Sequence, residues 1–214
     1  MWLEYLAHSC FLMTAENGYR VMIDPYDRDL GYKPIQRKTD VILVSHQHPD
    51  HSNIGGIPGN TKIFSSSGSF KTDNVQVKGM VGKHGGSSNS GFTLVFSIIM
   101  DGIKFSHLGD LGEVPQGPML DFLEGTQVMM LPVGGTYTLD PVRAKEVIEI
   151  IRPSIAIPMH YMTASLDKTR YPLGPVEDFT ALFAKTRIIR ESSMEITGDN
   201  LPDTTEIVIM NYTY

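Results

Sequence analysis

The chain has 214 residues and a formal net charge of −6, so it is long enough for one substantial hydrophobic core and lacks the basic stripe that binds nucleic-acid phosphates. The chain has a single cysteine, Cys10, which excludes an intrachain disulfide and favours a reducing compartment. We interpret Cys10 as a small buried hydrophobic residue. The longest apolar-leaning run, residues 92–100, is about half as long as a membrane-spanning helix. We therefore expect one cytoplasmic domain over residues 1–214, with neither nucleic acid nor a membrane as partner.

The first half of the chain predicts β-strands. Two apolar segments, residues 10–24 and 91–110, each contain an Asn-Gly or Asp-Gly turn dipeptide and end in an aspartate, Asp24 and Asp110, so we expect two similar hairpins. Residues 40–45 form a continuous apolar run, which is typical of a strand that is covered on both faces. Shorter strands are expected at residues 2–6, 61–66 and 74–81.

The second half alternates strands with helices. Asp140 as the N-cap and Pro141 at the first helical position predict a helix over residues 141–151, whose apolar residues recur on one face. The pattern as a whole predicts an α+β protein in which two mixed sheets pack together with helices outside them. The other expected elements are strands at residues 126–132 and 154–160, a helix at 175–186 and short strands within 187–214.

A dense cluster of polar residues follows the buried run that ends at Ser45. Residues two apart in an extended chain project to the same side, so His46 and His48 can reach one cation. Asp50 and His51 follow a turn and can face a second cation. Imidazoles combined with a carboxylate suit zinc and, less selectively, iron or manganese. The spacing therefore predicts a metal site.

Two complete sites need ligands from other parts of the chain. His160 ends the strand expected at residues 154–160, and Asp110 ends the second hairpin. Strand ends that meet at one edge of a sheet bring distant residues together. His84, His160 and Asp110 are therefore suitable as the remaining histidines and the shared acid.

Several short segments carry a family resemblance. SHQHPDH, residues 45–51, resembles the signature of the metallo-β-lactamase fold superfamily. HSCFL, IDP, HLGDLG, LPVGGTYT and IPMHY are similar to its uncharacterised zinc-dependent hydrolase-like branch, which is related to bacterial sugar-lactone phosphate hydrolases. The resemblance covers residues 8–161 with the motifs in the expected order. It implies a four-layer αββα sandwich with a binuclear metal site at one edge.

The resemblance also implies which residues bind each cation. Two glycines follow His84 where the branch often has an acid or serine, so His107 is the alternative third histidine of the first site. Strand alternation, however, turns His107 to the face opposite Asp110. The implied ligands are His46, His48 and His84 for the first cation and Asp50, His51 and His160 for the second, with Asp110 bridging both.

Three further residues have open roles. Asp24 either accepts the free ring N–H of a ligating histidine, which fixes the tautomer of that histidine, or is an ordinary strand-end acid before a proline turn. His8 either lines the site or forms a hydrogen bond inside the sheet. Tyr137 lies in the loop of residues 134–138, where it either hydrogen-bonds a substrate or belongs to a tight turn that leads into the next helix.

These residues predict a metal-dependent hydrolase. Two divalent cations, expected to be zinc with manganese or iron as alternatives, can lower the pKa of a shared water toward ~7. Asp50 and Asp110 are expected to orient the resulting hydroxide, which attacks an ester, lactone or phosphodiester bond of a small molecule.

Other functions stay open at this point. A nuclease of the same fold is disfavoured by the acidic chain, and a di-iron redox protein is disfavoured because such relatives usually carry an acid where His48 stands. A non-catalytic metal-binding or scaffold protein is the third alternative, and a homo-oligomer is compatible with the sequence.

Overall fold

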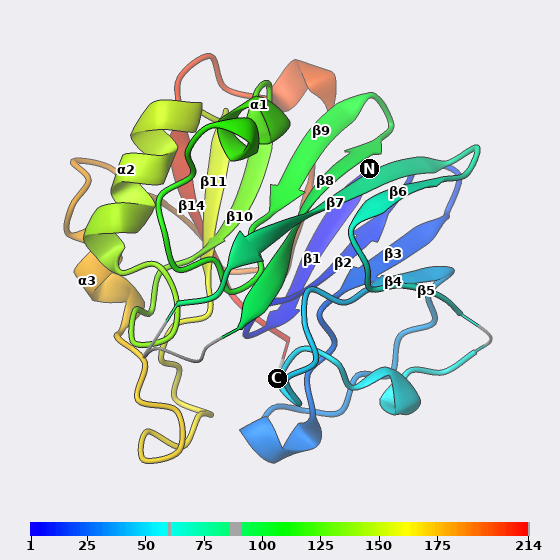
Figure 1. Cartoon of the computed structure of the whole chain (residues 1–214), viewed down its shortest axis with the longest axis horizontal. Coiled ribbons are helices and arrows are strands. Elements are labelled where there is room, and N and C mark those ends of the chain that lie inside the picture. Colours follow the sequence, from blue (N-terminus) through cyan, green and yellow to red (C-terminus); the bar gives the residue numbers. More distant parts are fainter. Residues whose placement is uncertain (60, 86–90, 214) are drawn as a thin grey trace.

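Two mixed β-sheets pack face to face in this computed structural model, which describes residues 1–59, 61–85 and 91–213 (Figure 1). In the first sheet, β1, β2 and β3 are antiparallel and β3, β4 and β5 are parallel. Its strands, in spatial order, are β13 (Ser193–Glu195), β1 (Trp2–Ala7), β2 (Cys10–Thr14), β3 (Arg20–Ile23), β4 (Val41–Leu43) and β5 (Lys62–Phe64).

The second sheet also combines two strand arrangements. Its strands from β6 to β9 are antiparallel neighbours, whereas β9, β10, β11, β14 and β12 run parallel. The strands are β12 (Arg187–Ile189), β14 (Glu206–Met210), β11 (Ile155–Met159), β10 (Val128–Pro132), β9 (Ile103–His107), β8 (Phe92–Met100), β7 (Val75–Lys83) and β6 (Gly68–Lys71). The predicted fold class, an α+β sandwich of two mixed sheets, is confirmed.

The apolar run before His46 is continuous because the first sheet is covered on both faces. Val41 and Leu43 belong to the core between the two sheets. Ile42 and Val44 belong to a second hydrophobic cluster on the outer face of the first sheet. This outer cluster contains the fully buried Cys10, as predicted for that residue. It is covered by loops and by two 3-10 helices, Arg28–Leu30 and Ile54–Gly56.

Three α-helices accompany the second sheet and lie beside β10, β11 and β14 in Figure 1. Helix α2 (Pro141–Ile151) has the predicted bounds, and the Asp140 side chain caps it by accepting a 2.9 Å hydrogen bond from the Arg143 amide. Ala144, Val147 and Ile148 form its buried stripe. The other helices are α1 (Pro118–Leu123) and α3 (Val176–Thr180).

Three sequence-based expectations differ from the structure. Helix α1 and strand β6 were not expected, because each is short and neither shows clear apolar periodicity. The helix expected at residues 175–186 ends at Thr180. Beyond it the chain tightens into turns whose hydrogen bonds span three residues, from the Phe183 amide to the Thr180 carbonyl for example. The apolar periodicity therefore continues although the α-helix does not.

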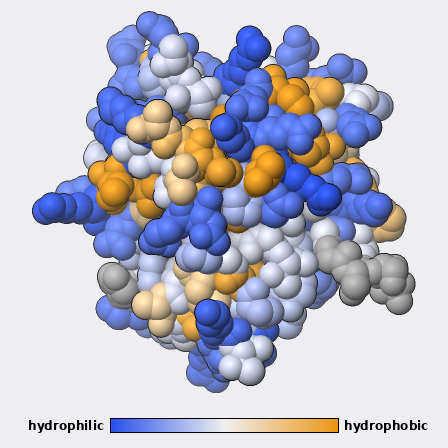
Figure 2. Space-filling model, turned by 90° about the vertical axis from the view of Figure 1, so that its left-hand side faces the viewer, coloured by the Kyte–Doolittle hydropathy of each residue, from blue (hydrophilic) through white to orange (hydrophobic). Residues whose placement is uncertain are grey.

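The helix-bearing side of the molecule is chemically mixed. Figure 2 shows this side, on which hydrophobic patches alternate with hydrophilic side chains. Val142 and Ile150, on the outer face of α2, are among the exposed apolar residues. Within the described part of the chain, no helix is both long and apolar enough to cross a membrane.

Candidate metal centre

Polar side chains from five separate segments meet at one edge of the sandwich. His46, His48, Asp50 and His51 follow β4 of the first sheet. Ligand-type residues also follow three strands of the second sheet and occupy the turn between β1 and β2: Asp110 after β9, His84 after β7, His160 after β11, and His8 in the turn. The expected convergence of strand ends is therefore present in the structure.

Asp110 lies at the centre of this cluster. Its Oδ2 atom is 3.3 Å from Nε2 of His84, 3.3 Å from Nε2 of His160 and 3.7 Å from Nε2 of His46. Its other carboxylate oxygen, Oδ1, is 3.4 Å from Nε2 of His51. One buried carboxylate thus faces four imidazoles. Two of them follow a strand of the first sheet, and two follow strands of the second sheet.

Asp24 orients the imidazoles of His51, by direct contact, and of His46, through Ser45. Its Oδ1 accepts a 2.7 Å hydrogen bond from the Ser45 amide, and its Oδ2 accepts bonds from the Ser45 hydroxyl at 2.6 Å and from Nδ1 of His51 at 2.9 Å. The Ser45 oxygen, having donated its proton to Asp24, accepts from Nδ1 of His46 at 2.9 Å. Both rings therefore use Nδ1 to bond the protein and direct Nε2 at the cluster.

His84 is fixed by a different partner. Its Nδ1 donates a 2.8 Å hydrogen bond to the carbonyl of Gly85, so its Nε2 is the ring nitrogen that points toward Asp110. Position 85 requires glycine, because a Cβ there would lie 2.5 Å from the carbonyl oxygen of Tyr137. The close approach of these two loops keeps His84 facing the cluster.

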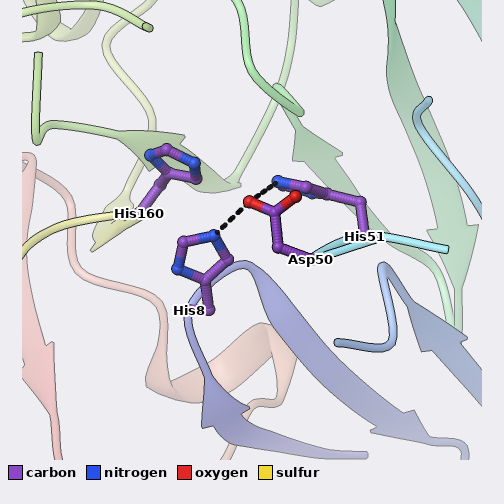
Figure 3. Close-up of side chains that lie close together, drawn as sticks. All are labelled: His8, Asp50, His51 and His160. Carbon is purple, nitrogen blue, oxygen red and sulfur yellow. Dashed lines mark hydrogen bonds and ion pairs between the residues drawn. The ribbon is translucent and has the colours of Figure 1, made fainter. Parts of the chain in front are cut away.

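The donor atoms divide into two main groups. His46, His48 and His84 form one, in which Nε2 of His46 lies 3.0 Å from Nδ1 of His48. The other consists of His8, Asp50, His51 and His160, whose side chains point toward one another in Figure 3. In each group, one donor atom per residue lies within 4.8 Å of all the others.

The charges in the cluster suit metal ligation. Burial raises the pKa of Asp110, but the nearby His160 and His51 outweigh this and hold the pKa of its carboxyl well below the ordinary value. Burial, together with His51, lowers the pKa of His46 to about 3. Asp110 is therefore charged and His46 is neutral at pH 7, which are the forms that bind cations.

The unpaired atoms of the cluster test whether a cation fits there. Nε2 of His51, Nε2 of His84 and Oδ1 of Asp110 are buried and have no hydrogen-bond partner among the described residues. Buried polar atoms without partners are costly, and these converge on one another across 3.3–3.4 Å contacts. A set of imidazole nitrogens and carboxylate oxygens fits zinc, iron or manganese. The residues present therefore fit a metal centre.

Comparison with known proteins identifies the family. The family model described as "Beta-lactamase superfamily domain" matches residues 2–160. A metal-dependent hydrolase of the UPF0173 group from Thermoplasma acidophilum is 30% identical over 187 residues, which cover 74% of this chain and 82% of the relative. A similar protein from Archaeoglobus fulgidus is 27% identical and covers 78% and 85% of the two chains.

A solved structure agrees with these sequence matches. A Thermotoga maritima protein assigned to the zinc-dependent hydrolases of the metallo-β-lactamase superfamily has a TM-score of 0.80 and 32% identity, covering 98% of this chain and 97% of that one. The chain belongs to the metallo-β-lactamase superfamily.

In this superfamily member, the residues predicted as metal ligands lie in the two donor groups or at their junction: His46, His48, Asp50, His51, His84, Asp110 and His160. His107 does not join them. Its Nε2 donates to the Ser9 carbonyl at 2.9 Å and its Nδ1 accepts from the Gly109 amide at 3.1 Å, so both ring nitrogens have protein partners. Of the two alternatives, His84 is thus the histidine that lies beside His46 and His48.

The remaining predicted residues have distinct positions. Asp24 lies behind the cluster and His8 within it. Tyr137 is 39% exposed. Its backbone, by contrast, packs against Gly85. The observed contacts of Tyr137 are therefore those of a loop residue that supports the segment after His84.

One orienting residue was missed in the sequence. Ser45 links Asp24 to His46 through its hydroxyl. Its position directly before His46 is the only sequence signal, and a serine at a strand end is common in proteins without metal sites. Only the approach of Asp24, which is brought there by the pairing of β3 with β4, shows its role.

Proposed function

We propose that this chain is a metal-dependent hydrolase that uses two divalent cations to cleave an ester, lactone or phosphodiester bond in a small molecule. One observation carries the proposal: the Nε2 atoms of four histidines converge on the buried Asp110 carboxylate. Two of these nitrogens, in His51 and His84, and Oδ1 of Asp110 have no protein hydrogen-bond partner among the described residues. The names of the relatives, metal-dependent and zinc-dependent hydrolases, support the same reaction class.

We assign the ligands from the two donor groups. His46, His48 and His84 would hold the first cation, and Asp50, His51 and His160 the second. Asp110 faces both groups, because its two oxygens contact His84 on one side and His51 on the other. We propose zinc for both positions, since imidazole is the predominant donor and zinc is bound preferentially by imidazole and thiolate ligands.

When bound, such a cation pair supplies a water with a pKa lowered toward ~7 and polarises the substrate oxygen. The protein side chains then orient the reactants. Asp50 is 15% exposed, whereas Asp110 is 3% exposed at its side chain, so Asp50 is the carboxylate nearer to solvent. Asp110 therefore holds the interior of the site, and Asp50 is placed to accept a proton from the attacking water.

The substrate enters on the side of His48. His48 is exposed whereas His46, His51, His84 and His160 are buried, so the donor groups open toward solvent at this residue. The net charge of the chain is −6, which disfavours a nucleic-acid backbone as the substrate. A small-molecule substrate is the proposal that agrees with these features.

The experiment is an activity screen on metal-free protein reloaded separately with Zn²⁺, Mn²⁺ or Fe²⁺. The panel contains p-nitrophenyl esters, lactones, bis(p-nitrophenyl) phosphate and RNA. Asp110→Asn and His48→Ala are the test variants, and Asp40→Asn, an exposed aspartate whose side chain accepts from the Arg20 amide, is the matched control. Hydrolysis lost in both test variants and kept in the control supports the proposal.

Three results would contradict it. Full activity of Asp110→Asn and His48→Ala would show that the cluster does not take part in the reaction. Tight metal binding without turnover on the whole panel would favour a non-catalytic role. Cleavage of RNA that exceeds cleavage of every small molecule would favour a nuclease.

A further inference from the structure

His8 occupies a strained turn at the edge of the cluster. It lies between β1 and β2 with a φ of 57°, in the left-handed region that residues other than glycine seldom adopt. The carbonyl of His8 accepts hydrogen bonds from the Tyr5 hydroxyl at 2.8 Å and from the His160 amide at 2.9 Å. A conformation of this kind persists only where surrounding contacts hold it. The two hydrogen bonds to its carbonyl therefore fix the backbone of His8.

His160 is held in the same way. Its φ is 52°, and its backbone is bound directly to that of His8. The centroids of the two rings are 4.3 Å apart. In both rings Nδ1 is buried without a hydrogen-bond partner among the described residues, unlike the rings of His46, His51 and His84. The two turns therefore present His8 and His160 as a pair, positioned by the backbone.

The His8 ring points at the second donor group. Its Nε2 lies 3.1 Å from Oδ2 of Asp50, and the same oxygen lies 3.5 Å from Nε2 of His51. Figure 3 shows the His8 ring and the Asp50 carboxylate pointing toward each other, with His51 and His160 beside them. The donor atoms of all four residues lie within 4.8 Å of one another.

These separations match those of atoms that share a cation. Two ligand atoms about 2.1 Å from one ion are about 3.0 to 3.4 Å apart when the angle between them is about 90° to 109°. The 3.1 Å between His8 and Asp50 falls in this range. The pair in the first donor group, His46 and His48, has nearly the same separation of 3.0 Å.

We propose that His8 is a fourth side-chain ligand of the second cation, in addition to Asp50, His51 and His160. This inference rests on the proposed function, because it assumes that the cluster binds two cations. The competing arrangement is a hydrogen bond in which Nε2–H of His8 donates to Asp50 and only orients that carboxylate. The two arrangements differ in one measurable property, which is whether Nε2 of His8 carries a proton or a metal bond.

Nuclear magnetic resonance of the full-length protein distinguishes them. The protein is labelled with ¹⁵N in its histidine rings and loaded with two equivalents of ¹¹³Cd²⁺. Direct ligation predicts that the Nε2 resonance of His8 is split by the cadmium nucleus and shows no attached proton. His107, whose two ring nitrogens have protein partners, is the internal control and stays unsplit.

The spectrum separates failure of this inference from failure of the proposed function. If His51 and His160 are split while Nε2 of His8 is protonated and unsplit, His8 is not a ligand but the metal centre remains. If no histidine is split at two equivalents of cadmium, the metal centre itself is wrong, and this inference fails with it.

A pair of variants provides a second test. Asparagine tolerates a left-handed backbone, so His8→Asn removes the imidazole with little disturbance of the turn. Asp24→Asn removes an orienting partner of His51 without removing a ligand, which typically weakens metal binding by about 10- to 100-fold. Loss of a ligand predicts a larger fall in cadmium affinity, at one of the two sites, for His8→Asn than for Asp24→Asn. A smaller fall would overturn the assignment.

Discussion

Nδ1 of His51 lies 2.9 Å from Oδ2 of Asp24, and both side chains are completely buried. The aspartate also accepts from the amide and hydroxyl of Ser45, so it binds three donors with two oxygens. This contact fixes the His51 ring with Nε2 directed at Asp110. The position of a single strand-end carboxylate thus determines which nitrogen of His51 is available to a cation.

Asp24→Asn is expected to weaken the binding of one cation by about 10- to 100-fold, because the amide cannot accept all three hydrogen bonds and the His51 tautomer is no longer fixed. Asparagine tolerates the φ of 48° at this position, so the backbone is retained. Competition titrations with a chromophoric chelator measure the affinity. Equal affinities in Asp24→Asn and in the Asp40→Asn control would show that this contact does not support the site.

Metal affinity is expected to rise with pH. Burial lowers the pKa of His51, but the carboxylates of Asp110 and Asp50 and the bond to Asp24 outweigh it and raise the pKa well above its ordinary value. Metal-free His51 is therefore protonated at neutral pH, and a cation must displace that proton. Calorimetry in buffers of different ionisation enthalpy between pH 6 and 8 should detect proton release. Binding that is independent of pH would contradict this charge assignment.

The same raised pKa predicts how the stability of the metal-free protein depends on pH. A group whose pKa is raised in the folded state contributes its full stabilisation below its unfolded pKa, about 6.5 for histidine, and loses it as the pH rises through the folded pKa. The metal-free protein should thus lose thermal stability as the pH is raised above neutrality. His51→Gln should lack this decline, whereas an identical decline in that variant would assign it to other groups.

Gly134→Ala is expected to damage the His160 turn. A Cβ at Gly134 would lie 2.2 Å from the carbonyl oxygen of His160, which accepts the Gly134 amide at 3.1 Å. Overpacking of this kind costs about 1–3 kcal/mol and should also weaken one cation site. Gly198→Ala is the matched control, since nothing lies within 4 Å of its added Cβ. Denaturant unfolding and metal titration should separate the two variants, and equal results would show that the turn adapts.

His84 and His107 are expected to respond differently to substitution. His84→Ala should lose one bound cation with a modest effect on the metal-free fold. His107→Gln should keep two cations but lower the free energy of unfolding by about 1–3 kcal/mol, because the Ser9 carbonyl and the Gly109 amide lose their partner. Elemental analysis and thermal unfolding measure both quantities. Retention of both cations by His84→Ala would contradict the proposed ligand set.

Local sequence patterns were sufficient for much of this molecule. The run that ends at Ser45 predicts a strand buried on both sides, and β4 has that environment because its residues divide between two hydrophobic clusters. The spacing of His46 and His48 predicted a shared direction, and the two rings meet at 3.0 Å. Both features depend on residues that are close in the chain, which is why the sequence contains them.

Long-range features could not be read in the same way. Strand β13 leaves its chain neighbours and pairs with β1 in the other sheet, so that Met194 lies opposite Leu3. The outer face of the first sheet is covered by 3-10 helices and loops, whose sequences show no helical periodicity. The hydroxyl of Ser45 and the turn of His8 gain their roles only from such packing.

The backbone hydrogen bond between His8 and His160 joins the turn between β1 and β2 to the turn that follows β11. A cation held by both side chains would act as a cross-link between these remote segments, in a protein whose lone cysteine cannot supply one. A chelator that removed this cation would then remove a cross-link of the tertiary structure as well as the metal needed for hydrolysis. Resistance of the chain to proteases and heat would consequently follow the supply of metal in its surroundings.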